Sequence, residues 1–205
     1  MVVDRSPRHP SAVAQTTVVV AAEVVPTDEA ALGALVGSLV ARGVGRVAVD
    51  APSALSTLPH AGDVTLGAKF RAARCGEVAL GRERGVWVPW VSPPAPPLAG
   101  WMDVGLRLFA GLAAAGLDAV ETFPQAVFRA WTGGAPLPPK SRPDGLAARA
   151  RLLAAAGLAE PSLAVWTHDG LDAAACALVA CGPSVAVTCG HDGSAVWLPP
   201  VSPPA

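Results

Sequence analysis

The sequence predicts an α/β protein with a mixed central sheet flanked by helices, built as a single domain over residues 1–205. Short apolar or β-branched segments alternate with longer helical segments, and this order is typical of folds with parallel strand pairing. Hairpin-like strands near both ends indicate additional antiparallel pairing. The chain is 52% hydrophobic and 15% charged, and its 205 residues suffice for one domain with a sizeable core but are short for two.

The first half of the chain predicts two strands and two helices. In chain order these are a strand over residues 16–25, a helix over 27–43, a strand over 45–52 and a helix over 63–80, followed by a proline-rich covering loop over 86–100. Thr27 is the expected N-cap of the first helix, and Gly43 is expected to close it. The second strand (GRVAVDAP) is almost wholly apolar up to Asp50, which predicts a central strand covered on both faces.

The second half predicts four further helices and three strands. In chain order these are a helix over 100–116, a strand over 117–124, helices over 124–131 and 144–156, a helix from about residue 168, and two hairpin strands over 184–190 and 194–199. The turn GHDG between the last two strands is rich in glycine, as hairpin connections are. His191 and Asp192, which lie in this turn, are interpreted as structural.

Charge and cysteine spacing limit the function classes. A net charge of −1 excludes the global basic field that drives tight nonspecific binding of nucleic acids, so such a contact must come from a local patch. No segment predicts a transmembrane span or a signal peptide, and the cytoplasm is the expected location. The four cysteines have neither CxxC nor zinc-like spacing, and Cys176 and Cys189 are interpreted as small buried hydrophobic residues.

Four carboxylates have positions that predict a common site. Asp50 ends one apolar strand and Glu121 ends another, and parallel neighbours bring such residues to the same edge of a sheet. Asp169 and Asp172 lie three residues apart at the start of a helix, so they share one face. If that helix packs at the same edge, the four groups converge.

A cluster of carboxylates without histidine or cysteine ligands favours Mg²⁺ or Mn²⁺. The cation offsets the repulsion between like charges, and two such ions can support phosphodiester hydrolysis. Each residue also has a structural explanation: Asp50 as a turn former before Pro52, and Asp169 as a charge at a helix start. His168 is too isolated in the sequence to be assigned as a ligand.

Several motifs together resemble the DUF429 family, whose members are predicted nucleases with an RNase H-like fold. The matching stretches, in family order, are 47–55 (VAVDAPSAL), 74–80 (RCGEVAL), 120–128 (VETFPQAVF), Lys140 with 148–158 (ARARLLAAAGL), 168–180 (HDGLDAAACALVA) and 192–199 (DGSAVWLP). The most specific are the acid–x–aromatic–Pro element and the D-x-x-D-A helix. This helix is also similar to the last helix of Holliday-junction resolvases, in which both aspartates belong to the metal site.

The resemblance implies a metal-dependent nuclease with nucleic acid, either DNA or RNA, as its partner. It implies a further acidic ligand on an opening strand, for which Asp4 is the candidate, although only three residues precede it. It also implies phosphate contacts by Lys140, Arg149 and Arg151, which would otherwise be read as solvated helix residues. The predicted catalytic and metal-binding set is therefore Asp50, Glu121, Asp169, Asp172 and Asp4.

Other interpretations remain open. The short opening strand and near-neutral charge favour a catalytically degenerate RNase H-like module that binds a partner. Actin-like ATPases and sugar kinases share the core, but this chain lacks their glycine-rich phosphate loops. Arg74 and Glu77, three residues apart, are expected to pair with each other. Three tryptophans are interpreted as core or loop anchors rather than base-stacking platforms: Trp87, Trp90 and Trp101.

Overall fold

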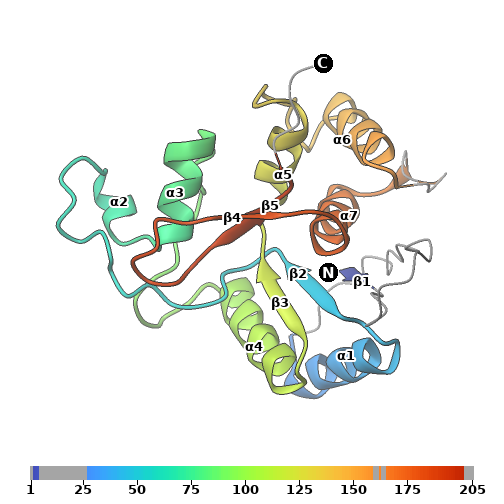
Figure 1. The fold of residues 1–205 in the computed structure, drawn as a ribbon, viewed down its shortest axis with the longest axis horizontal. Helices are drawn as coiled ribbons and strands as arrows, with labels where there is room; N and C mark the ends of the chain where they lie inside the picture. Colours follow the sequence, from blue (N-terminus) through green and yellow to red (C-terminus); the bar gives the residue numbers. More distant parts are fainter. Residues whose placement is uncertain (1, 5–26, 159–161, 163–164, 201–205) are drawn as a thin grey trace.

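The computed structural model describes residues 2–4, 27–158, 162 and 165–200 (Figure 1). The predicted α/β class is confirmed. The strand predicted over residues 16–25 lies outside the described residues. None of the described helices combines the length and apolar character needed to cross a membrane.

The strands form two small sheets. The first has the order β1-β2-β3, in which β1 (Val2–Asp4) is antiparallel to β2 (Arg46–Val49), and β2 is parallel to β3 (Asp118–Glu121). The second is an antiparallel pair of β4 (Val185–Val187) and β5 (Val196–Leu198), as predicted for the closing hairpin. Within the described ranges, the single central sheet that the sequence predicts is therefore divided in two.

The hairpin meets the first sheet at one end of β3. Thr122, directly after β3, donates a hydrogen bond through Oγ1 to the carbonyl oxygen of Trp197 at 2.7 Å. Pro124 is the first residue of helix α5 (Pro124–Trp131), and it ends the extended segment soon after β3. Because β3 stops here, β5 contacts its end through a side chain instead of continuing its ladder.

Strand β2 is buried on both faces, which confirms its predicted central position. Val47 and Val49 pack in a cluster with α1 (Glu29–Ala41) and α4 (Gly100–Ala114). The intervening Ala48 points to the opposite cluster, which includes α5, α6 (Pro143–Ala155) and α7 (His168–Cys181). Figure 1 shows α1 and α4 on one side of β2 and β3, and the other three helices on the far side.

Two local predictions are wrong. Asp28, not Thr27, caps α1, because its side chain accepts a hydrogen bond from the backbone N–H of Ala31 at 2.8 Å. The helix predicted over 63–80 is instead a short α2 (Ala68–Arg71) and a separate α3 (Cys75–Arg84). Its predicted start is a turn, in which Asp63 accepts hydrogen bonds from the backbone N–H and hydroxyl of Thr65.

A disulfide joins the start of α3 to the loop after β4. Cys75 and Cys189 are 114 residues apart in the sequence, and their Cα atoms lie 5.0 Å apart. The interpretation of Cys189 as a small buried hydrophobic residue is therefore wrong. Cys176, in contrast, is buried in α7 as predicted.

Candidate metal centre at the carboxyl ends of the strands

Asp50 follows the last residue of β2 and occupies the predicted edge of the sheet. In the parallel register Val49 lies beside Glu121, so Asp50 and Glu121 are at the carboxyl ends of neighbouring strands. Asp50 is exposed, and its surface lines two adjoining hollows of about 280 and 380 Å³. Crowding by protein atoms nevertheless desolvates the carboxyl. This desolvation and the repulsion from Asp172 outweigh the opposing charge of Lys140, and together they raise the pKa of Asp50 to about 7.

Asp172 brings the second carboxylate to this edge from helix α7. The helix packs against β1 and β2, and Asp172 is buried one turn inside it. Lys140 Nζ lies 2.6 Å from Asp172 Oδ2, and its side chain is 46% exposed. Asp50, Asp172 and Lys140 line the same hollow. Arg129 lines this hollow as well, where its guanidinium donates to a backbone carbonyl oxygen. Of the two bases only Lys140 pairs with an acid of the hollow, so Asp50 has no ion-pair partner among the described residues.

The packing of α6 positions Lys140. Gly145 lies so close to the preceding loop that a Cβ atom there would be 2.0 Å from the carbonyl oxygen of Pro139. Arg149 donates from Nη1 to the carbonyl oxygens of Pro138 and Gly145, both at 3.0 Å. A glycine and a buried arginine thus hold the loop that ends in Lys140.

Asp169 and His168 lie at the outer rim of the site. Thr167 caps α7 by accepting a hydrogen bond from the backbone N–H of Gly170. His168 Nδ1 lies 2.7 Å from Asp169 Oδ1, and the Asp169 side chain is 80% exposed. One candidate ligand atom from each of His168, Asp169 and Asp172 lies within 4.8 Å of the others. His168, which the sequence interpretation set aside, is therefore a further candidate ligand.

Glu121 has a different environment from the one predicted. It is buried, and both of its oxygens accept charged hydrogen bonds from Arg74, with Arg74 Nη1 at 2.7 Å from Oε2. The same Oε2 accepts from the backbone N–H and the hydroxyl of Ser53, at 2.8 and 2.9 Å. Glu121 therefore fixes the turn that carries Asp50, and its lone pairs are largely occupied.

Arg74 also contacts Glu77, which confirms the predicted pair. Arg74 Nη2 lies 3.2 Å from Glu77 Oε1, and Glu77 also accepts hydrogen bonds from the backbone N–H and hydroxyl of Ser92. Burial alone would lower the pKa of Arg74, but hydrogen bonds and charges from Glu121 and Glu77 outweigh it and hold that pKa above its usual range. We call Arg74, Glu77 and Glu121 the Arg74 network.

Three other predicted residues lie apart from this edge or are already engaged. In the antiparallel register Asp4 pairs with Arg46 at the start of β2, so its backbone lies at the opposite end of that strand from Asp50. The Arg149 guanidinium is 2% exposed and packs 5.4 Å from the Phe128 ring, so it does not form the predicted phosphate contact in this conformation. Arg151 is exposed on α6, where its Nε donates to the carbonyl oxygen of Ala147.

The tryptophans differ from one another. Trp87 anchors its loop by packing on Phe70 with ring centroids 4.4 Å apart, although 43% of it is exposed. Trp90 and Trp101 are 67% and 47% exposed and line the hollow that also contains Asp50 and Glu121. Of the two predicted roles, core anchor or loop anchor, the first is wrong for both. The proline-rich loop carries Trp90, and the first turn of α4 carries Trp101, to the hollow that the carboxylates line, a position that sequence spacing does not reveal.

Comparison with known proteins gives one match. A family model described as "Protein of unknown function (DUF429)" matches residues 106–190, less than half of the chain. The matched region contains Glu121, Lys140, Asp169 and Asp172, whereas Asp50 and Arg74 lie before it. The comparisons with curated proteins and with solved structures find no match.

Proposed function

We propose that this chain is a metal-dependent nuclease of the RNase H-like fold that hydrolyses phosphodiester bonds with Mg²⁺ or Mn²⁺. The observation that carries the proposal is the convergence of Asp50, at the end of β2, with Asp172 on α7. Desolvation and mutual repulsion raise the pKa of Asp50 to about 7, although Lys140 is close by. Two neighbouring carboxylates, of which Asp50 has no ion-pair partner among the described residues, are suited to a hard divalent cation.

The donor set fits a cation in part. Asp50 and Asp172 would hold it, with Asp169 and His168 at the rim. Glu121 would act as a positioning residue, because its oxygens are occupied by Arg74 and Ser53. When bound, a divalent ion supplies Lewis acidity and lowers the pKa of a bound water.

Other residues of the site suit a nucleic-acid substrate. Lys140 is half exposed beside the carboxylates, so its ammonium can leave Asp172 and neutralise a phosphate. Trp90 and Trp101 offer exposed rings in the adjoining hollow, and aromatic rings stack on bases without regard to sequence. The D-x-x-D helix lies within the region that matches the DUF429 model, and the sequence resemblance to that family implies the same assignment.

The alternative is a catalytically degenerate RNase H-like module that binds a partner. Two observations favour it: Glu121 is occupied by Arg74, and the backbone of Asp4 lies at the far end of β2 from Asp50. Both residues belong to the metal set that the sequence predicts. A site reduced to Asp50, Asp172 and rim ligands would bind cations more weakly.

Calorimetric titration with Mg²⁺ and with Mn²⁺ distinguishes these functions. We expect the wild-type protein to bind at least one ion, and Asp172→Asn to lose that binding. Asp118→Asn is the matched control, because Asp118 is 61% exposed and pairs with Arg46 at the opposite end of the sheet. Cleavage is then measured with labelled single-stranded DNA, duplex DNA and RNA in each metal.

Each outcome has a defined meaning. Metal binding and cleavage that are both lost in Asp172→Asn, but kept in Asp118→Asn, support the nuclease. Nucleic-acid binding without cleavage supports the degenerate module. A wild-type protein that binds neither ion contradicts the metal centre.

A further inference from the structure

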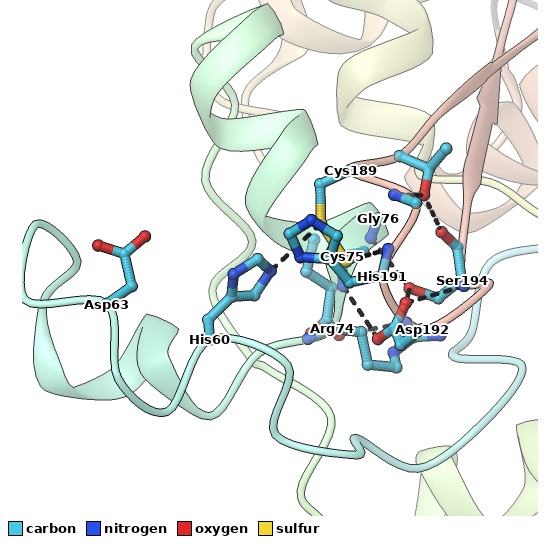
Figure 2. Close-up of a disulfide and its surroundings, with 12 residues drawn as sticks. His60, Asp63, Arg74, Cys75, Gly76, Cys189, His191, Asp192 and Ser194 are labelled. Atoms are coloured by element: carbon cyan, nitrogen blue, oxygen red, sulfur yellow. Dashed lines mark hydrogen bonds and ion pairs between the residues drawn. A yellow bond between two sulfur atoms is a disulfide. The ribbon is translucent and has the colours of Figure 1, made fainter.

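A second cluster of metal-binding residues lies around the disulfide, outside the carboxylate site. Cys75 begins α3, Cys189 follows β4, and His60 belongs to the loop between β2 and α2 (Figure 2). His60 Nε2 lies 3.5 Å from Cys189 Sγ, and one ligand atom from each of the three residues lies within 4.8 Å of the others. The imidazole of His191 is 6.2 Å from that of His60, measured between ring centroids.

We propose that the reduced form of this cluster binds one zinc ion through Cys75, Cys189 and His60, with His191 as the fourth ligand. The disulfide is then the oxidised, metal-free state of the same site. Two thiolates and two imidazoles form a common zinc set, whose donors lie about 2.0–2.3 Å from the metal. Such donors are about 3.3–3.8 Å apart, so Cys75, Cys189 and His60, whose ligand atoms lie within 4.8 Å of one another, need only small movements. The His191 imidazole lies outside this group and must move toward the sulfurs to complete the set.

The surroundings of the two sulfurs support a thiolate site. Cys75 is the first residue of a ten-residue helix, where the partial positive charge of the helix start favours a thiolate. The backbone N–H of His191 also points to Cys75 Sγ, at 3.3 Å. His60 is only 6% exposed, and sulfur is the partner of its Nε2 atom. A buried imidazole aimed at two sulfurs is more specific than a chance surface histidine.

A second layer of hydrogen bonds fixes the loop that carries Cys189 and His191. Asp192 accepts from the backbone N–H of Cys75 at 3.1 Å and from the backbone N–H and hydroxyl of Ser194. Ser194 Oγ in turn accepts from the backbone N–H of Gly76 at 3.0 Å. Figure 2 shows this loop facing the first turn of α3. Such outer contacts orient metal ligands without binding the metal themselves.

The disulfide is converted into the zinc-bound form by reduction followed by metal binding. A dithiol reductant gives two electrons and two protons to the sulfur–sulfur bond, which breaks into two thiols while the reductant becomes a cyclic disulfide. Zn²⁺ then replaces the two thiol protons, which are released to water. An oxidising compartment favours the disulfide and a reducing one favours the metal form, but the α3 start and the β4–β5 loop remain tied together in both.

Cobalt(II) titration tests the proposal on the full chain. After reduction with a phosphine and removal of the reductant, we expect one equivalent of Co²⁺ to give thiolate charge-transfer absorption and tetrahedral d–d bands, both abolished by Zn²⁺. The oxidised protein should give neither. His60→Gln should weaken Co²⁺ binding at least ~10-fold, and Cys75→Ser should remove most of the charge-transfer band. Cys181→Ser, which changes a cysteine outside the disulfide, should match the wild type.

Alkylation followed by mass spectrometry keeps the test independent of variant folding. In the reduced wild-type protein, Zn²⁺ should protect Cys75 and Cys189 from alkylation but leave the reactivity of Cys181 unchanged. Three results overturn the proposal: no thiolate band in the reduced protein, equal binding by the oxidised protein, or equal loss in Cys181→Ser and Cys75→Ser. These readouts do not depend on nuclease activity, so they are separate from the test of the carboxylate site.

Discussion

The Arg74 network and the Asp50 site contain the same charges in different surroundings. Each has two carboxylates around one cation that pairs with one or both of them: Glu77 and Glu121 with Arg74, and Asp50 and Asp172 with Lys140. Arg129 also lines the hollow of the second site but forms no ion pair there. The Arg74 side chain is 1% exposed, and the carboxylates of Glu77 and Glu121 also accept hydrogen bonds from serine hydroxyls. Lys140 is 46% exposed, and none of the described residues donates a hydrogen bond to the Asp50 carboxyl. Similar charges therefore form a buried, structural ion-pair network in one region, and in the other a partly exposed site whose protonation changes near neutral pH.

The largest expected effect on stability comes from removing the cation of the Arg74 network. Arg74→Met leaves the buried carboxylates of Glu77 and Glu121 without their cation, and breaking a buried ion pair in this way costs about 3–5 kcal/mol. We expect the free energy of unfolding, measured by urea denaturation at pH 7, to fall by that amount.

Arg107→Met is the matched control for this change. Arg107 pairs with Asp103 one turn away at the surface and donates from Nη2 to the carbonyl oxygen of Thr27 at 2.8 Å. The ion pair contributes about 0.3–0.5 kcal/mol and the hydrogen bond about 0.5–1.5 kcal/mol, together less than the loss expected for Arg74→Met. Equal losses in Arg74→Met and Arg107→Met would show that the Arg74 network does not differ from a surface ion pair.

The next effect concerns the pH response of Asp50. Its pKa in the folded protein is about 7, above the ordinary value of 3.8, so between about pH 4 and 7 the folded state keeps a proton that the unfolded state releases. The ionised group therefore costs stability as pH rises through this window. We expect Asp50→Asn to raise the melting temperature at pH 8, and the gain to vanish near pH 4.

Scanning calorimetry at several pH values, with a chelator present, measures this difference. The chelator matters because a bound cation would stabilise the ionised form of Asp50 and mask the effect. A gain that is the same at every pH would mean that the substituted amide acts through packing, and a loss at pH 8 would contradict the raised pKa.

Local sequence features were sufficient to predict the sheet edge. Residues 46–49 (RVAV) and 118–121 (DAVE) are short and apolar at their centres, and the intervening helix α4 requires a crossover that makes them parallel neighbours. Asp50 and Glu121 therefore reach the same edge without any knowledge of packing. The prediction of the helix over 63–80 failed because a side-chain turn at Asp63 competes with helix formation, which a count of apolar residues does not detect.

The partners of these residues could not be predicted, because they come from distant parts of the chain. Arg74 and Glu121 are separated by 47 residues, and Cys75 and Cys189 by 114. No periodicity relates such positions. Arg149 and Arg151 illustrate the same limit within one helix. At about 100° per residue they point in different directions, and the first is buried between Phe128 and the loop at Pro138.

A smaller effect is expected when the cation of the Asp50 site is removed. Lys140→Met should lower the free energy of unfolding by about 1–3 kcal/mol, because it leaves the buried carboxylate of Asp172 without its cation, although the lysine itself is half exposed. Its charge lowers the pKa of Asp50, so the variant should titrate Asp50 at a higher pH than the wild type does. Carbon-13 NMR of the carboxyl group, with Asp50→Asn to assign the signal, measures this shift. An unchanged or lower midpoint would contradict the coupling.

The smallest effect on stability is expected at Arg151, which is exposed on α6, whereas Arg149 on the same helix is buried. Arg151→Met should alter the free energy of unfolding by less than ~0.5 kcal/mol, because the side chain is exposed on α6. If its guanidinium contacts a phosphate, as the sequence resemblance implies, the slope of log affinity for a DNA duplex against log salt should fall by about 0.9. Fluorescence anisotropy over a range of salt concentrations measures that slope. An unchanged slope would exclude Arg151 as a phosphate contact. Because Arg149 is buried, Lys140 would then be the one residue of the three predicted phosphate contacts that can still bind a phosphate.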